Sequence, residues 1–171
     1  MIKFEEYIRN IPDFPIKGIQ FKDITTLLQQ GDIFASAIDY LYEPFRQKEI
    51  QKIAGIEARG FIFGAALSYK LNVGFVPIRK PGKLPADTFK VNYELEYGEN
   101  SLEIHKDAIQ KNERVLLIDD LLATGGTARA SCELIKKCGG KVEGISFLIE
   151  LIDLNGRNLI KDYDVHTLMQ M

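Results

Sequence analysis

Apolar residues along the chain recur in two patterns, short continuous runs and stretches with helical spacing, and these patterns alternate. Val115–Ile118 is a short run of branched apolar residues without polar alternation, which favours a strand buried on both faces of a parallel sheet. Beyond a turn, the apolar residues from Ala128 to Cys138 return at helical spacing. Gly139-Gly140 then provides residues that end a helix in the left-handed conformation. The pattern here predicts strand, turn and helix.

The same alternation extends over the rest of the chain. It predicts helices over 32–47 and 60–71, and strands over 52–56, 73–78, 142–151 and 165–169. Strands alternating with helices indicate an α/β fold, a doubly wound, mostly parallel central sheet flanked by helices. Residues 80–98 break the pattern with prolines and glycines followed by polar and apolar alternation, which predicts a flexible lid entering a hairpin. Without a repeat or linker, 1–171 is expected to form a single domain.

Composition narrows the class of protein only slightly. The chain has 171 residues, of which 46% are hydrophobic and 27% charged, as in ordinary globular domains. The 22 Lys and Arg against 24 Asp and Glu give a net charge of -2, so we expect neither a nucleic-acid-binding surface nor a membrane partner. No apolar run approaches the length of a membrane span or a signal peptide, which predicts a cytoplasmic protein. Cys132 and Cys138 lie too far apart on the predicted helix to bridge, so we expect reduced thiols.

The segment RVLLIDDLLATGGTARA places two carboxylates beside what resembles an anion cradle. Ala123–Thr127 precedes the predicted helix, whose unpaired N–H groups and dipole favour a phosphate. Its two glycines permit a close approach of the backbone, and its two threonines add hydroxyl donors. Asp119 and Asp120 would repel that phosphate in a shared site, whereas a ribose diol suits them as a donor of hydrogen bonds. The segment therefore predicts a ribose 5-phosphate site.

Two simpler interpretations compete with this one. Paired aspartates after a strand also cap helices or hold Mg²⁺, and Gly-Gly also forms plain turns. The combination of both features with a following helix favours the phosphate site. The chain has no Gly-x-Gly-x-x-Gly motif opening a helix after a strand and no Gly-Lys-Ser/Thr P-loop, which weakens dinucleotide and P-loop alternatives.

VLLIDDLLATGGTARA resembles the phosphoribosyl-pyrophosphate motif of the type I phosphoribosyltransferases. The flanking segments, in this order, resemble those family members that act on adenine: IPDFPIKGIQFKDITTLL, IAGIEARGFIFGAAL, VPIRKPGKLP, YELEYG and LEIHKDAI. The resemblance implies the type I fold with a small N-terminal hood over 1–30 that binds the base. It also implies transfer of the 5-phosphoribosyl group from phosphoribosyl pyrophosphate to N9 of adenine, giving AMP and pyrophosphate in purine salvage.

The resemblance assigns roles to further residues. A pyrophosphate loop is implied at GIEARGF, with a non-proline cis peptide between Glu57 and Ala58, and Arg59 would neutralise the leaving group together with a second cationic cluster. That cluster consists of Arg79, Lys80 and Lys83. Spacing alone leaves these cations open to interpretation as solvated surface charges. Mg²⁺ is the expected cofactor, held mainly by the substrate's pyrophosphate and ribose hydroxyls, because it prefers phosphate oxygens and water to an all-protein cage.

For the base, the resemblance points to Phe21 as a stacking face and to backbone groups around Gln20 and Lys22 at the purine edge, with Leu121 nearby. Phe21 is alternatively a core residue. The family more often has Arg at position 22 and an apolar residue at position 20. If the backbone makes the contacts with the base, Lys22 and Gln20 are tolerated at these positions.

Two residues of the predicted lid complete the catalytic set that the resemblance implies. Glu96 would assist loss of the purine proton or bind its polar edge, and Tyr97 would pack over the sugar. The expected catalytic residues are thus Glu96, Arg59, Asp119 and Asp120. Without the resemblance, ELEYG is read more simply as a polar strand face.

Two rival functions are also compatible with parts of the sequence. One is a nucleotide-binding regulator of RNA or DNA, for which the near-neutral charge gives no basic stripe. The other is a phosphoribosyltransferase for xanthine, hypoxanthine or orotate. Family resemblance also implies a homodimer, with the arm around Arg79 close to the partner.

Overall fold

The computed structural model describes residues 2–94 and 99–171. They form two compact units, Met1–Tyr40 and Leu41–Met171, which are described separately. Within the described residues, no helix is long and apolar enough to cross a membrane.

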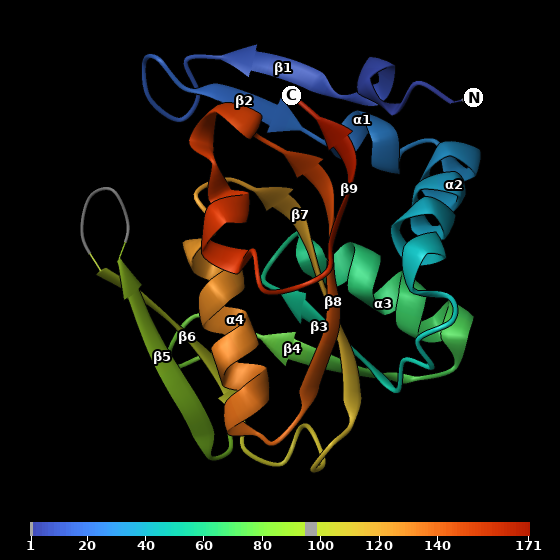
Figure 1. Cartoon of the computed structure of the whole chain (residues 1–171). Helices are drawn as coiled ribbons and strands as arrows, with labels where there is room; N and C mark the ends of the chain where they lie inside the picture. Colours follow the sequence, from blue (N-terminus) through green and yellow to red (C-terminus); the bar gives the residue numbers. More distant parts are fainter. Residues whose placement is uncertain (1, 95–98) are drawn as a thin grey trace. The chain divides into compact units, whose positions relative to one another are not determined.

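Unit 1 is built on an antiparallel hairpin of β1 (Arg9–Pro12) and β2 (Gln20–Asp23), shown in blue in Figure 1. The 3-10 helix η1 (Phe4–Tyr7) precedes the hairpin and the short helix α1 (Thr25–Leu28) follows it. The hydroxyl of Thr26 donates to the carbonyl of Tyr7 at 2.6 Å, so the first turn of α1 is tied to the chain before the hairpin.

A buried carboxylate closes the hairpin. Asp23 accepts two hydrogen bonds from the Arg9 guanidinium, at 2.9 and 2.6 Å, and others from the backbone and hydroxyl of Thr25. Hydrogen bonds from the N–H of Thr25 and from the guanidinium of Arg9 lower the pKa of Asp23 to about 2. Asp23 therefore joins the end of β2 to the beginning of α1.

Helix α2 (Gly31–Tyr42) leads from unit 1 into unit 2 and is followed by the 3-10 helix η2 (Glu43–Phe45). The sequence predicted one helix over 32–47, which is too long. Pro44 explains the difference, because proline lacks an N–H and disfavours helical geometry at the residue before it.

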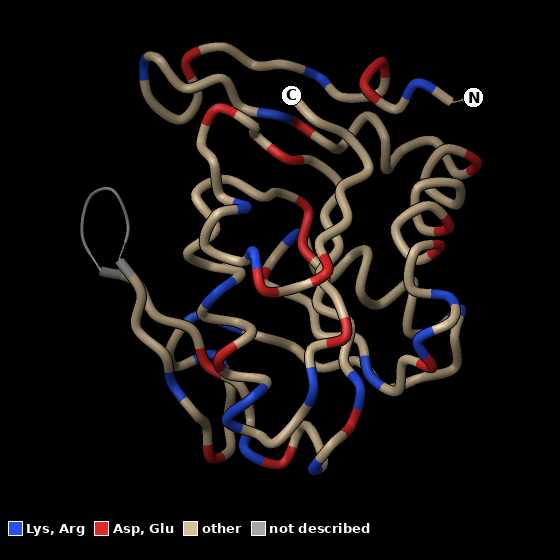
Figure 2. The backbone as a smooth tube through the Cα atoms, viewed as in Figure 1, with Lys and Arg blue, Asp and Glu red and all other residues tan. Residues whose placement is uncertain are grey.

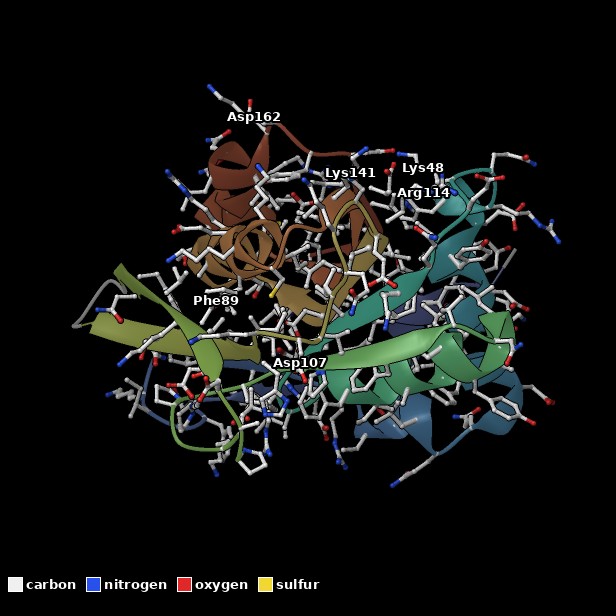
Figure 3. All side chains as sticks on the ribbon, turned by 90° about the horizontal axis from the view of Figure 1, so that it is seen from below. Lys48, Phe89, Asp107, Arg114, Lys141 and Asp162 are labelled. Atoms are coloured by element: carbon white, nitrogen blue, oxygen red, sulfur yellow. The ribbon has the colours of Figure 1, made fainter. Side chains whose placement is uncertain are left out.

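Unit 2 contains a five-stranded parallel sheet in the order β4-β3-β7-β8-β9. Its strands are β3 (Lys52–Ile56), β4 (Gly74–Ile78), β7 (Arg114–Leu122), β8 (Lys141–Glu150) and β9 (Val165–Gln170). The predicted parallel sheet is confirmed. Figure 3 views the end where the strands begin, and there Lys48, Arg114 and Lys141 lie close together. The ligand-binding end of such sheets is the opposite one.

Two helices cover the sheet. Helix α3 (Gly60–Leu71) packs on β3, β4 and β7, and helix α4 (Gly126–Lys137) packs on β7 and β8. Neighbouring residues of a strand point to opposite faces of the sheet. On the face covered by α4, Ala54 of β3 and Leu117 of β7 belong to the same hydrophobic cluster as the buried residues of α4. The predicted boundaries of β3 and α3 are confirmed, and α4 ends at the predicted glycines, with Gly139 at φ +92°.

A second hairpin, β5 (Thr88–Glu94) with β6 (Glu99–His105), lies beside α4 (Figure 1). The hairpin predicted within the lid is confirmed. Its stem is not a free loop, however, because Val91, Leu102 and Ile104 are buried in the cluster that also contains α4. A lid movement of the whole segment 80–98 would have to break this packing.

Strand β7 is longer than expected. The sequence pattern ended the strand at Ile118, before the two aspartates, but pairing with β8 continues through Asp119, Leu121 and Leu122. A strand can contain a buried carboxylate when other groups donate hydrogen bonds to it or pair with its charge.

The 3-10 helices η3 (Ile152–Leu154) and η4 (Gly156–Ile160) connect β8 to β9.

Candidate functional site

The carboxyl end of β7 continues into a tight loop that opens α4. Gly125 stands at the helix N-terminus with φ +86°, a conformation that glycine adopts without the penalty of a Cβ. The N–H of Arg129 donates to the carbonyl of Gly125 at 3.0 Å, which begins the helical ladder. The earlier N–H groups of such a helix have no intrahelical partner and can bind an anion.

A small cavity of about 70 Å³ lies against this loop. Its lining combines Asp119 with the predicted phosphate loop and apolar side chains: Leu121, Leu122, Ala123, Thr124, Gly125, Thr127, Ala128 and Phe147. The structure thus brings one predicted ribose-binding carboxylate, the predicted phosphate loop and Leu121 to one place. A larger hollow of about 490 Å³ lies along α4 and η4, lined by exposed groups of both charges such as Arg129 and Asp162, and it contains none of the predicted site residues.

The two aspartates differ in their surroundings. Asp119 accepts a hydrogen bond from the N–H of Asp120 at 2.9 Å, and its carboxylate lies where a Cβ on Gly60, at the start of α3, would come within 2.7 Å. Asp120 is buried and forms an ion pair with Arg59, with 2.9 Å between Oδ2 and Nε. The two carboxylates that the sequence analysis assigned together to a ribose diol thus have different partners in this structure.

Burial sets the electrostatics of this pair. The removal of water around Asp119, together with the adjacent charge of Asp120, raises the pKa of Asp119 well above its ordinary value of 3.8. Burial also raises the pKa of Asp120, against the influence of the Arg59 guanidinium. A cation or a hydroxyl donor near Asp119 would relieve this unfavourable charge.

The predicted pyrophosphate residues meet at the ends of β3 and β4. The peptide between Glu57 and Ala58 is cis, which confirms the prediction. Glu57 accepts a hydrogen bond from Nε of Arg79 at 2.7 Å, and Arg79 also donates to the carbonyl of Lys83 at 3.2 Å. The side chains of Lys80 and Lys83 are exposed. Arg79 thus contacts Glu57 of the cis peptide directly, and Arg59 follows that peptide in the sequence with its side chain paired to Asp120.

Three of the predicted base-binding residues, Gln20, Phe21 and Lys22, lie on β2 in unit 1, whereas Leu121 lies on β7. Phe21 is half-buried and meets the ring of Phe14 edge to face, with 5.0 Å between centroids. It is therefore not a fully buried core residue. The side chain of Gln20 accepts a hydrogen bond from Asn10. In the part of the chain that the structure describes, β1 is the one strand that pairs with β2, which leaves the other backbone edge of β2 without a strand partner.

Glu96 and Tyr97, predicted for the lid, lie outside the described residues.

Two groups beside the phosphate loop were not predicted from the sequence. The hydroxyl of Thr127 donates to that of Tyr93 on β5 at 3.3 Å, and the backbone of Gly156 packs directly on the loop. An Asn-Gly pair signals a turn at positions 155–156, but no pattern signals its contact with residues 123–125.

Comparison with known proteins agrees with the geometry. The family described as phosphoribosyl transferase domain matches residues 23–168. Adenine phosphoribosyltransferase of Chloroflexus aurantiacus is 59% identical over 95% of this chain and 94% of its own length.

Two solved structures extend the comparison. Adenine phosphoribosyltransferase from Thermoanaerobacter pseudethanolicus superimposes with a TM-score of 0.96 at 52% identity, covering 99% of this chain and 98% of that one. The enzyme from Saccharomyces cerevisiae, complexed with D-2,5-dideoxy-2,5-imino-altritol 1,6-bisphosphate and adenine, gives a TM-score of 0.92 at 39% identity over 97% and 96% of the two chains. The chain therefore belongs to the phosphoribosyltransferase family and, within it, to the adenine phosphoribosyltransferases.

Proposed function

We propose that this enzyme transfers the 5-phosphoribosyl group from phosphoribosyl pyrophosphate to N9 of adenine, giving AMP and pyrophosphate. The observation that carries the proposal is the cavity in which Asp119 and the loop Ala123–Thr127 meet at the end of a parallel strand. The high identity to adenine phosphoribosyltransferases over almost the whole chain supports the choice of base.

In this proposal the phosphate loop binds the 5'-phosphate. The positive φ of Gly125 turns the backbone into α4, and Thr124 and Thr127 line the cavity with hydroxyl groups. Asp119 accepts from the ribose diol, where its unfavourable charge gains hydroxyl donors. Asp120 positions Arg59 through their 2.9 Å ion pair and shares the diol only when that pair opens.

Departure of pyrophosphate leaves positive charge on the sugar and collects negative charge on the leaving group. Groups of opposite charge fixed in advance lower this barrier, because they need little reorganisation when the charges develop. The backbone of Glu57 and Ala58, the guanidinium groups of Arg59 and Arg79, and the ammonium groups of Lys80 and Lys83 are our candidates for the leaving group. Purine N9 then attacks the opposite face of the sugar, and we assign Glu96 and Tyr97 of the lid to this step.

Mg²⁺ is the proposed cofactor. Among residues 2–94 and 99–171, no group of three or more His, Cys, Asp or Glu side chains is arranged to hold a metal ion. In our proposal the ion therefore takes its ligands mainly from the pyrophosphate and ribose oxygens and from water, as Mg²⁺ commonly does. When bound, the ion would neutralise charge on the leaving group.

Adenine recognition is assigned to β2 and to Leu121. Phe21 offers a partly exposed ring, and the backbone N–H and C=O groups near Gln20 and Lys22 on β2 are our candidates for the purine edge. The edge of adenine pairs an amino donor with a ring-nitrogen acceptor, and 6-oxopurines reverse this order. A fixed backbone pair would leave two mismatched polar groups against a 6-oxopurine, each costing about 1 to 3 kcal/mol when buried.

A base panel tests the function. The purified protein is incubated with phosphoribosyl pyrophosphate, Mg²⁺ and radiolabelled adenine, hypoxanthine, guanine, xanthine or orotate. We expect AMP formation with a specificity constant at least about a hundredfold above that for any other base, because sites built on hydrogen bonds reject mismatched analogues strongly. Conversion of hypoxanthine within about tenfold of adenine would overturn both the backbone readout and the assignment of the base.

We further propose a single catalytic domain over 1–171, with the hood at 1–30 and the lid at 80–98, acting as a cytoplasmic homodimer. Helix α3 supports the dimer. Ile62 and Tyr69 lie two helical turns apart on one face of α3 and remain 39% and 92% exposed. An exposed apolar face of this kind is typical of an interface, and we assign it to a second copy of the chain, with the arm around Arg79 nearby. Figure 2 shows Lys and Arg interspersed with Asp and Glu in unit 2, which gives a nucleic-acid partner no support.

A further inference from the structure

The phosphate loop packs on the backbone of another segment without side chains between them. A Cβ placed on Gly156 would lie 2.0 Å from the carbonyl oxygen of Ala123 and 2.9 Å from the nitrogen of Gly125. A Cβ placed on Gly125 would lie 2.2 Å from the carbonyl oxygen of Gly156. Gly156 is buried at the beginning of η4. Because both contacts are backbone to backbone, the position of Gly156 sets the position of the loop.

The residue after Gly156 is held by a chelated ion pair. Arg157 donates from Nε to Oε1 of Glu150 at 2.9 Å and from Nη2 to Oε2 at 2.6 Å, and its Nη1 donates to the carbonyl of Val165 at 2.9 Å. Glu150 is 5% exposed and also accepts from Thr167 and Gln170, both at 3.1 Å. Arg157 is thereby fixed to the end of β8 and to β9.

Glu150 stands next to the base of the loop as well. The N–H of Leu151, the residue after Glu150, donates to the carbonyl of Leu122 at 2.9 Å, and Leu122 is the last residue before the loop. The ends of β7 and β8 are therefore joined at the point where the loop begins. The glycine contact thus reaches Ala123 and Gly125, and this hydrogen bond holds the residue directly before them.

We propose that Glu150 and Arg157 are positioning residues for the 5'-phosphate: their ion pair holds Gly156 under Ala123–Gly125 and so directs the loop's N–H groups at the phosphate. This inference rests on the proposed function. Neither side chain lines the cavity of the phosphate loop. Displacements of about 1 Å at a binding group are enough to reduce activity up to about a hundredfold, so a support of this kind affects the substrate without touching it.

Two conservative changes test the proposal. Arg157→Lys keeps the charge but loses the planar fork that meets both carboxylate oxygens, and Glu150→Gln keeps the shape but loses the charge. Calorimetric titration measures the binding of ribose 5-phosphate and, separately, of pyrophosphate, and steady-state assays give KM for phosphoribosyl pyrophosphate and adenine. The control is Arg114→Lys, which alters an ion pair with Glu49 at the opposite end of β7, roughly 25 Å from Leu122 at the rise of an extended strand.

We expect each change to weaken ribose 5-phosphate binding about tenfold and to raise KM for phosphoribosyl pyrophosphate similarly, while pyrophosphate binding and KM for adenine stay unchanged. The double variant should bind no more weakly than Arg157→Lys, because the two groups act as one unit. If Arg157→Lys does not fold, Glu150→Gln carries the test. Wild-type affinity for ribose 5-phosphate in the variants, or equal weakening of both ligands, overturns the positioning role. Failure of the wild-type protein to bind ribose 5-phosphate or form AMP overturns the proposed function instead.

Discussion

Asp119 and Asp120 are neighbours in the sequence but not in chemistry. Asp120 has a guanidinium partner, whereas Asp119 has an N–H donor and the repulsion of its neighbour. A carboxyl group whose pKa is raised in the folded state binds protons more tightly there than in the unfolded chain. Its ionised form therefore destabilises the fold once the pH exceeds its ordinary pKa. A site that holds such a group trades stability for the ability to bind hydroxyl donors.

Asp119→Asn should accordingly raise the melting temperature near neutral pH while it lowers turnover. The gain over wild type should shrink as the pH falls towards about 3.8, the ordinary pKa, and should be lost below it, because the wild-type carboxyl is then protonated in both the folded and the unfolded chain. Thermal denaturation across pH, together with the AMP assay, measures both effects. A lower melting temperature for Asp119→Asn near neutral pH would contradict this electrostatic account.

Changing Asp119 and Asp120 together to Asn should greatly reduce turnover with the fold intact, and normal turnover would remove both from the site.

Phe21→Ala should raise KM for adenine by removing the stacking face, and KM for phosphoribosyl pyrophosphate should change little. Base–aromatic stacking contributes about 1 to 3 kcal/mol, so an increase of roughly tenfold or more is expected. Lys22→Arg is the matched control, because it changes a side chain on the same strand and leaves the proposed backbone contacts in place. Steady-state kinetics distinguish the cases. An unchanged KM for Phe21→Ala would return Phe21 to a purely structural role.

The grouping of candidate site residues was predictable where one short segment contained the whole signal. The aspartates, the glycines and the threonines of the phosphate loop follow one another in the chain, and the cavity does combine Asp119 with that loop. The pairing of Asp120 with Arg59 and the contact of Gly125 with Gly156 were not predictable, because each joins segments that only the folded sheet brings together. Long-range pairing leaves no periodicity in the sequence.

Elements were predicted best where hydrophobic spacing and end signals agreed. The boundaries of β3 and α3 match the prediction, and α4 ends where Gly139-Gly140 indicated. Two errors have local causes. Pro44 ends α2 earlier than predicted, and parallel pairing with β8 extends β7 beyond its apolar run. Spacing alone cannot anticipate how far a neighbouring strand extends a ladder.

Gly139→Ala tests the end of α4. Gly139 has φ +92°, and a side chain in the left-handed region costs about 1 to 2 kcal/mol. Gly31→Ala at the start of α2 is the matched control, since a Cβ there meets nothing within 4 Å. Chemical denaturation should show the loss for Gly139→Ala and no loss for Gly31→Ala. Equal stabilities of the two variants would mean that the helix end adapts freely.

The assembly of the whole molecule is testable through the exposed face of α3. Ile62→Glu combined with Tyr69→Glu places two charges on that face and should convert dimers to monomers in light scattering coupled to size-exclusion chromatography. Leu154→Glu in η3, at a residue 46% exposed, is the control and should leave the mass unchanged. A dimer that withstands the double change would place the interface on another surface.

The edge of the sheet restricts how such an assembly can be built. Strand β4 forms one edge of the sheet. The carbonyl of Ile78 accepts a hydrogen bond from the N–H of Glu57, so the backbone polar groups of Ile78 point toward β3. The backbone groups of the alternate residues Phe75 and Pro77 therefore point away from the sheet. Pro77 has no N–H to offer, and Arg79 already exchanges both backbone hydrogen bonds with Glu103. Prolines and covered ends of this kind prevent edge-to-edge aggregation. This side of the protein therefore resists the growth of fibrils by strand addition, and a second copy that approaches it must dock through side chains rather than continue the sheet.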